Sequence, residues 1–122
     1  MDRERFETLV MKAVESLPED LLESMENVDI QVVDEPTPEQ LKTMHERDDE
    51  ILLGLYEGIP LTQRGAGYGL VMPDRISIFQ ENIERVCRTD QEVVDEVRKV
   101  VIHEIAHHFG ISDARLDELG WG

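Results

Sequence analysis

The sequence of 122 residues is poor in cysteine and in aromatic residues, with one Cys, one Trp, two Tyr and three Phe. A single cysteine, Cys87, excludes an internal disulfide and is typical of a protein from a reducing compartment, so we predict a cytoplasmic location. With few aromatic residues, aliphatic side chains must fill most of the interior. Hydrophobic residues still make up 40% of the sequence, which suffices for one core, and we predict a single domain over residues 1–122.

Long apolar runs are also missing. No stretch approaches the roughly 20 apolar residues that a membrane-spanning helix needs. The first ten residues, MDRERFETLV, lack the extended apolar stretch of a secretory signal. We therefore expect no association with a membrane.

Basic residues are scarce: 12 Lys and Arg stand against 28 Asp and Glu, which gives a net charge of −16. Such a surface repels phosphate backbones, so we expect no binding of nucleic acid. It favours cationic partners or cationic segments of a substrate. The simpler interpretation is that the acidic residues form a solvated surface that keeps the protein in solution.

Apolar spacing predicts a mixture of helices and strands. Helical spacing from Phe6 to Leu17 predicts a first helix that ends before Pro18, and a further short turn of helix is expected over residues 19–25. Alternation predicts strands over residues 28–32 and 75–80, and residues 51–56, ILLGLY, predict a further strand that ends before Gly58 and Pro60. The polar segment 39–50 is expected to be a loop with a short helix.

The clearest predicted element is a helix over residues 90–109, about 30 Å long. Thr89 and Glu92 have the spacing of a capping box, an apolar stripe follows them, and Gly110 supplies the stop signal. A short helical turn is expected over residues 113–119.

The end of this predicted helix carries the motif HEIAHHFGISD, residues 103–113. His103 and His107 are four residues apart and lie on one face of a helix, so both imidazoles can reach one ion. Two imidazoles with a carboxylate are a typical zinc donor set that leaves a position for water. Glu104 can stand beside that water and take its proton. We therefore predict a catalytic type of zinc site with Glu104 as general base.

The third zinc ligand is predicted to be Asp113, because the turn at Gly110 reverses the chain towards the histidines. Asp117 and Glu118 lie a few residues further on and compete for this role. His108 points about 100° away from His107 around the helix axis, and we expect it to pack or to form a hydrogen bond.

The other reactive side chains are expected to have structural roles. Residues 65–69, GAGYG, lack the strand–loop–helix context of a phosphate-binding loop and are expected to connect two strands. We expect Tyr56 and Tyr68 in the core or at its rim, Arg64 and Arg75 in surface ion pairs, Cys87 buried and His45 exposed.

Three segments resemble the small bacterial zincin-like metallopeptidases, which are also described as minimal metzincin-like domains. The segments are LLGLYEGIPLTQRG (52–65), PDRISIFQ (73–80) and VVIHEIAHHFGISDARLDELGW (100–121). The resemblance covers nearly the whole chain, and the first and last segments are specific to that family, whereas HExxH alone is not. The HExxHxxGxxD form is also similar to that of snapalysin-type metzincins, whose aspartate at this position is the third ligand.

This resemblance implies an α+β zincin-like fold, with a small mixed β-sheet packed on two main helices and the metal-binding helix lining a cleft near the C-terminus. It implies His103, His107 and Asp113 as zinc ligands and Glu104 as the base of a metallopeptidase that acts on a peptide or protein substrate.

The sequence departs from larger metzincins after the motif. Those proteases continue into a subdomain with a methionine turn, whereas this sequence ends nine residues after Asp113 and its last methionine is Met72. We therefore expect a small or extended substrate, a partner protein that completes the cleft, or weak catalysis. The alternative hypothesis is a zinc-binding regulatory or interaction module with little or no proteolytic activity.

Overall fold

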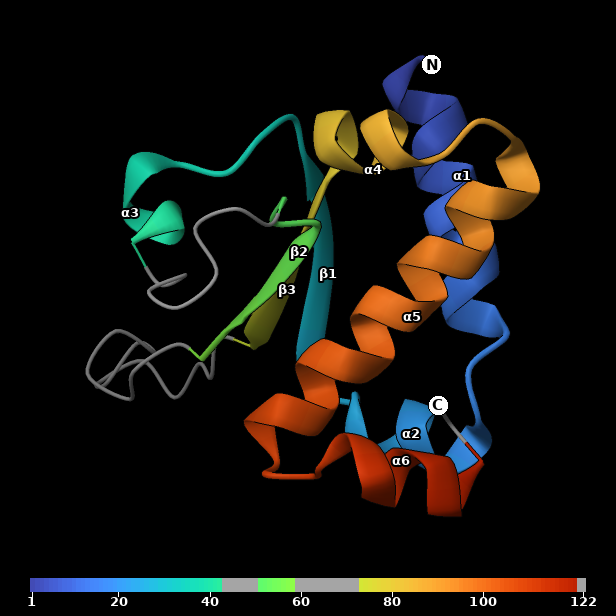
Figure 1. Cartoon of the computed structure of the whole chain (residues 1–122), viewed down its shortest axis with the longest axis vertical. Helices are drawn as coiled ribbons and strands as arrows, with labels where there is room; N and C mark the ends of the chain where they lie inside the picture. Colours follow the sequence, from blue (N-terminus) through green and yellow to red (C-terminus); the bar gives the residue numbers. More distant parts are fainter. Residues whose placement is uncertain (43–50, 59–72, 121–122) are drawn as a thin grey trace.

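The computed structural model describes residues 1–42, 51–58 and 73–120, apart from the side chain of Asp113. Figure 1 shows α1 and α5 on one side of a three-stranded sheet and α3 on the other side. This is an α+β arrangement with two main helices, as predicted. The elements are α1 (Arg3–Glu15), α2 (Glu19–Ser24), β1 (Val28–Val33), α3 (Pro38–Leu41), β2 (Gly54–Glu57), β3 (Asp74–Phe79), α4 (Gln80–Val86), α5 (Asp90–His108) and α6 (Asp113–Leu119).

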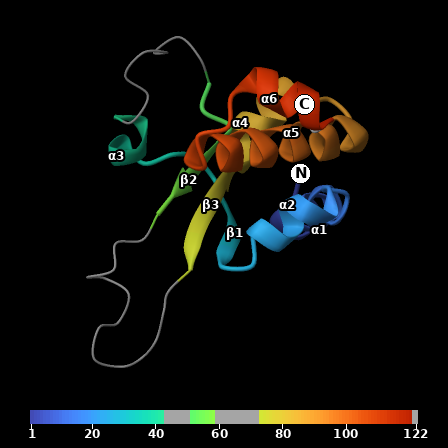
Figure 2. The same ribbon diagram turned by 90° about the horizontal axis from the view of Figure 1, so that it is seen from below.

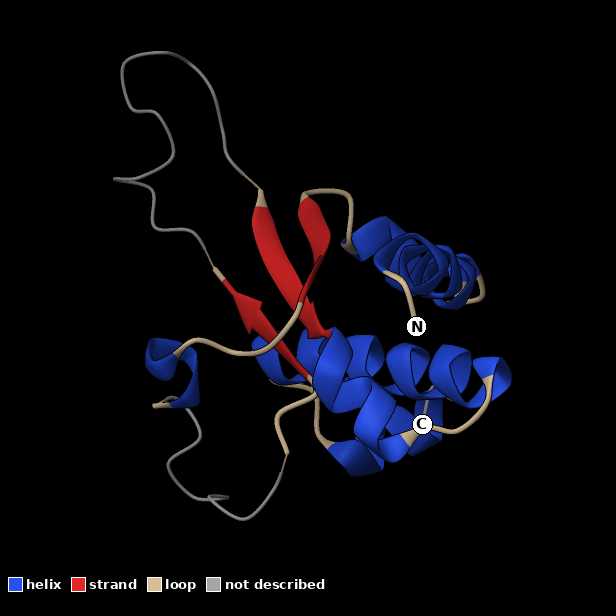
Figure 3. Ribbon diagram, turned by 90° about the horizontal axis from the view of Figure 1, so that it is seen from above, coloured by secondary structure: helices blue, strands red, loops and turns tan. Residues whose placement is uncertain are grey.

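The sheet has the strand order β1-β3-β2 and is mixed, which confirms the prediction. β1 runs parallel to β3, with Ile30 opposite Ile76, and β2 runs antiparallel to β3, with Tyr56 opposite Ile76. The Phe79 amide donates to the Leu53 carbonyl at 3.1 Å, which extends this ladder by one residue before β2. β2 is therefore an edge strand within the described sheet (Figure 3).

One hydrophobic core joins α1, α5 and the sheet. Ile76 and Ile78 of β3 face this core and are fully buried, in agreement with the predicted alternation. Phe79 is also fully buried. The largest core side chains of the helices are Phe6, Leu9, Leu21, Ile83, Ile102, Ile105 and Leu116, and Leu17 joins them from the turn between α1 and α2.

Helix α5 begins and ends close to the predicted residues. The Thr89 hydroxyl accepts the Glu92 N–H at 3.1 Å, as in a capping box, but the Glu92 carboxylate accepts from the Arg88 N–H instead of the Thr89 N–H. The helix ends at His108, with Phe109 as its C-cap. No helix within the described residues is both long and apolar enough to cross a membrane.

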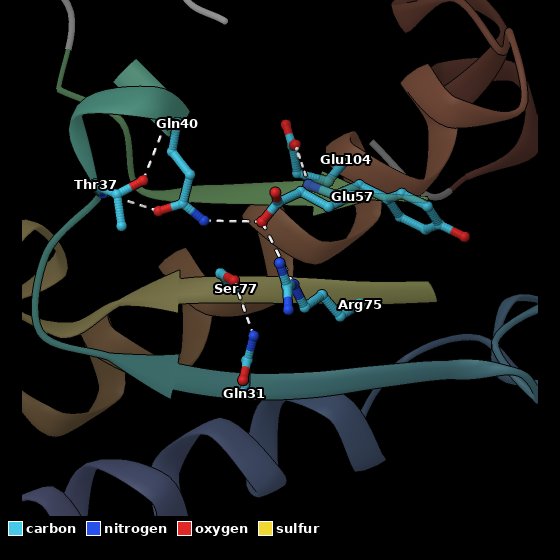
Figure 4. A network of polar contacts seen from close by, with 8 residues as sticks. Gln31, Thr37, Gln40, Glu57, Arg75, Ser77 and Glu104 are labelled. Atoms are coloured by element: carbon cyan, nitrogen blue, oxygen red, sulfur yellow. Dashed lines mark hydrogen bonds and ion pairs between the residues drawn. The ribbon is translucent and has the colours of Figure 1, made fainter. Parts of the chain in front are cut away.

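Helix α3 is tied to the edge strand by a polar network (Figure 4). Thr37 and Gln40 form a full capping box, and the Gln40 amide donates to Glu57 Oε1 at 2.8 Å. Arg75 Nε lies 3.5 Å from the same oxygen. Because alternate side chains of a strand point to opposite faces, Glu57 points towards α3 and Tyr56 lies on the face of β2 that meets α5.

Two boundaries and one helix differ from the sequence-based prediction. β2 begins at Gly54, three residues later than predicted, and Gln80 begins helix α4 instead of ending a strand. Helix α4 was missed because its contacts come from distant segments: Asn82 donates to the Leu52 carbonyl at 2.8 Å, and Arg3 donates to the Gln80 side chain at 2.7 Å. The rest of the predicted loop, residues 43–50, lies outside the described residues.

Gly54 provides a test of how closely β2 approaches α5. A Cβ atom at this position would lie 2.5 Å from Val100 Cγ1 and 3.1 Å from the Ser77 carbonyl oxygen. We expect Gly54→Ala to lower the free energy of unfolding by about 1–3 kcal/mol through overpacking. In the double variant with Val100→Ala the loss should be smaller than the sum of the single losses, as measured by urea unfolding. Additive losses would contradict the contact.

Candidate metal centre

The histidine pair of the motif lies on the last two turns of α5. The ring centroids of His103 and His107 are 6.4 Å apart, and the ring planes differ by 25°. His103 is half-buried and His107 is exposed. The four-residue spacing thus places both imidazoles as neighbours on one face of the helix, as the sequence predicts.

Glu104 points to a different neighbour. Its Oε1 accepts the backbone N–H of Tyr56 at 2.9 Å, so the side chain reaches from α5 towards β2 (Figure 4). Burial raises the pKa of the Glu104 carboxyl, while the Tyr56 N–H and then His107 and His103 act in the opposite direction. The result is a carboxyl group that binds a proton more readily than one in water and has one oxygen fixed.

The turn after α5 brings the chain back as predicted. Gly110 has a φ of +73°, a left-handed conformation that suits glycine. Its N–H donates to the His107 carbonyl at 3.2 Å, and the Ile111 N–H donates to the Ala106 carbonyl at 2.7 Å, which together form a Schellman motif. Helix α6 then runs back beneath the end of α5 (Figures 1 and 2).

Asp113 is the first residue of α6, and the Ser112 side chain caps the helix by accepting the Arg115 N–H at 3.2 Å. The side chain of Asp113 is outside the described part, so the role of Asp113 as third ligand stays a prediction. Of its rivals, Glu118 accepts a hydrogen bond from the Arg115 guanidinium at 2.9 Å, and Asp117 is exposed.

His108 packs against the edge strand. Its ring stacks on the Tyr56 ring with centroids 4.0 Å apart and an angle of 18°, and it meets Phe109 edge to face. The Tyr56 hydroxyl donates to Asp74 Oδ2 at 2.7 Å. This agrees with the expectation that His108 packs and that Tyr56 lies at the rim of the core.

The described side chains are of the types that suit a zinc site. Imidazoles are favoured zinc ligands, and the neighbouring Glu104 carboxylate points to Tyr56 instead of lying between the two histidines. Within residues 1–42, 51–58 and 73–120, taken without the side chain of Asp113, no three His, Cys, Asp or Glu side chains form a group that could hold a metal. The described part therefore supplies two candidate ligands, His103 and His107, and one candidate base, Glu104.

The remaining candidates have structural contacts or cannot be placed. Arg75 pairs with Glu57, as expected. The free thiol of Cys87 is half-buried, less than expected, and burial raises its pKa. The candidates outside the described residues are His45, Arg64, Tyr68 and the glycine-rich segment 65–69.

Sequence reasoning missed the contribution of Tyr56 to the site, because it acts through its backbone N–H. The local signal is the alternation Gly54, Tyr56, Gly58 in the sequence GLYEG, which leaves two positions without a side chain on the face that meets α5. This pattern can be interpreted only once the packing of β2 against α5 is known.

The raised pKa of Glu104 predicts a pH dependence of stability in the metal-free protein. Because the folded protein binds the proton more tightly than the unfolded chain, stability falls as pH rises above the ordinary Glu pKa of about 4.3. Glu104→Gln removes this titration. In urea unfolding with chelator, the stability of the variant relative to the native chain should rise from about pH 4 towards about pH 7. A constant difference would contradict the burial of the charge.

Comparison with known proteins agrees with this fold. A conserved hypothetical protein from Thermo thermophilus has a similar fold, with a TM-score of 0.54, 21% sequence identity, and coverage of 89% of this chain and 94% of that chain. No curated protein matches the chain. The family model of the zincin-like metallopeptidases matches residues 25–121, which include the edge strand, helix α5 and the histidine motif. The chain therefore belongs to the zincin-like metallopeptidase family.

Proposed function

We propose that the protein is a zinc-dependent metallopeptidase that hydrolyses peptide bonds, with Glu104 as the general base. The placement of Glu104 carries this proposal: its carboxyl group is half-buried beside the histidine pair, and one oxygen is held by the Tyr56 N–H at 2.9 Å. Membership of the zincin-like metallopeptidase family supports the same class of reaction.

His103, His107 and Asp113 are the residues that would hold the zinc ion. The two histidines suit this role because their rings are neighbours on one face of α5. Asp113 suits it because the Schellman turn at Gly110 reverses the chain immediately before it. When bound, zinc supplies Lewis acidity, which lowers the pKa of water towards neutrality and polarises a carbonyl group.

Glu104 is proposed to move the proton. Hydrolysis joins the oxygen of water to the carbonyl carbon, breaks the C–N bond and transfers one proton to the departing nitrogen. The Glu104 carboxylate accepts this proton from the attacking water and then donates it to the amine. Since Tyr56 holds Oε1, Oε2 is the oxygen assigned to the transfer. Burial raises the pKa of Glu104 above its ordinary value, which suits a group that must both accept and release a proton.

The charge of the protein suggests the kind of substrate. A net charge of −16 attracts cationic chains, so we propose a peptide or protein segment rich in Lys or Arg, with a partner protein that contributes to the cleft. We further propose a cytoplasmic setting, which the single, free Cys87 supports.

The same charge also favours the alternative, a zinc-binding module that docks a cationic partner without cutting it. The two functions share the metal site and differ in the need for Glu104. Measurements of zinc content and of peptide cleavage, made on the same variants, separate them.

Zinc binding is tested with single substitutions of the proposed ligands. We expect about one zinc ion per chain, and a loss of affinity of at least about 100-fold for His103→Ala, His107→Ala and Asp113→Asn, measured by competition with a chelating dye. Asp117→Asn and Glu118→Gln are the matched controls and should bind zinc like the native chain. If either control loses zinc while Asp113→Asn keeps it, the third ligand is wrongly assigned.

Hydrolysis is tested with a library of basic peptides. The zinc-loaded protein should cleave them, a chelator should stop cleavage, and Glu104→Gln should lower kcat by about 10²–10⁴-fold because the proton carrier is lost. Zinc content of the variant should equal that of the native chain. Cleavage that Glu104→Gln leaves unchanged contradicts the mechanism, and zinc binding with no cleavage by the native chain favours the interaction module.

A further inference from the structure

Helix α5 and strand β2 run side by side with matching repeats. Four residues of an α-helix advance by about 6.0 Å, and two residues of a strand advance by about 6.6 Å, so every fourth helix residue meets every second strand residue over a short length. Two rows of three residues meet in this way. The helix row is Val100, Glu104 and His108, and the strand row is Gly54, Tyr56 and Gly58.

The backbone N–H groups of the strand row point away from β3. Residues 53 and 79 share a ladder hydrogen bond, and the register then pairs residues 55 with 77 and 57 with 75. In an antiparallel ladder the residues between these pairs direct their N–H groups outward. The outward N–H of Tyr56 is the one that Glu104 accepts.

Contacts along the two rows occur at each step. At the first step, a Cβ on Gly54 would lie 2.5 Å from Val100 Cγ1, so the backbone of the strand lies directly against the helix. At the second step, Tyr56 N donates to Glu104 Oε1 at 2.9 Å. At the third step, His108 stacks on the Tyr56 ring at 4.0 Å.

Gly54 makes this close approach possible at one end, whereas at the other end a side chain on Gly58 would meet its neighbours only at ordinary van der Waals distances. His108 Cε1 would lie 3.9 Å from a Cβ on Gly58, and Asp74 Oδ1 would lie 3.7 Å from the same point. Tyr56 is thus the one residue in the strand row with a side chain, and three groups hold it: Glu104 at its N–H, His108 at its ring face and Asp74 at its hydroxyl.

We propose that His108 and Tyr56 are positioning residues: the stacked ring of His108 fixes Tyr56, and the Tyr56 N–H fixes the Glu104 carboxylate for proton transfer. This inference rests on the proposed function. It assigns His108 a role other than metal binding, although it is the third histidine of the motif. Its ring packs on Tyr56, whereas the rings of His103 and His107 neighbour each other on another face of α5.

The first test needs no activity. Amide hydrogen exchange of Tyr56 is measured by NMR in the full chain, metal-free and zinc-loaded, for the native chain, His108→Ala and His108→Phe. Phe keeps a flat ring that can stack, whereas Ala does not. We expect the Tyr56 amide to exchange at least about tenfold faster in His108→Ala and at nearly the native rate in His108→Phe, in both metal states. Equal exchange in the native chain and His108→Ala overturns the proposal.

The second test separates positioning from metal binding. Loss of alignment by about 1 Å can cost on the order of 100-fold in rate. We expect His108→Ala to lower kcat by about 10–100-fold with little change in KM or zinc content, and His108→Phe to restore kcat to within about threefold of the native value. Loss of zinc from His108→Phe overturns the proposal, because it would make His108 a ligand.

A second variant keeps the test decisive if His108→Ala does not fold. His108→Leu occupies the space of the ring at this exposed position without stacking, so it should fold, speed exchange of the Tyr56 amide and lower kcat as expected for His108→Ala. A kcat unchanged in His108→Ala or in His108→Leu overturns the inference alone. Absence of cleavage by the native chain overturns the proposed function itself.

Discussion

The contact between helix α5 and edge strand β2 is the constraint on which the site depends. Two close contacts make it up: Gly54 leaves room for the Val100 side chain, and the Tyr56 N–H donates to Glu104. A helix that must lie this close to a strand cannot rotate freely about its axis. The rotation that places Glu104 on β2 therefore also fixes the direction of His103 and of the residues that follow α5.

The electrostatics of the site follow from the same contact. A carboxylate beside a packed strand loses hydration, which disfavours its charged form, and a single backbone N–H offsets part of that cost. The two imidazoles of the motif act in the same direction as the N–H. Glu104 therefore binds a proton more readily than a solvated glutamate does. A group in this condition is suited to carry a proton during hydrolysis, whereas a fully solvated glutamate would remain charged throughout.

Local sequence signals were sufficient for the elements that carry the motif. The cap at Thr89, the apolar stripe and Gly110 predicted α5 to within one residue, because each acts through nearby backbone groups. Gly110 also predicted the turn before α6, and the alternation of apolar residues predicted β3. Helix α4 could not be predicted, since its buried polar residues bond to segments 30 or more residues away. The contact between Tyr56 and Glu104 spans 48 positions and depends on the packing of two elements, which no local pattern encodes.

The central claim is that Glu104 stays on the edge strand while neighbouring residues hold the metal. A crystal structure of the zinc-loaded protein, with anomalous scattering recorded at the zinc edge, tests it most directly. We expect one strong zinc peak bound by His103, His107 and Asp113, with the Glu104 carboxylate outside the ligand set and still within hydrogen-bonding distance of the Tyr56 N–H. A zinc ion ligated by Glu104 or by His108, or no zinc at this end of α5, would contradict it.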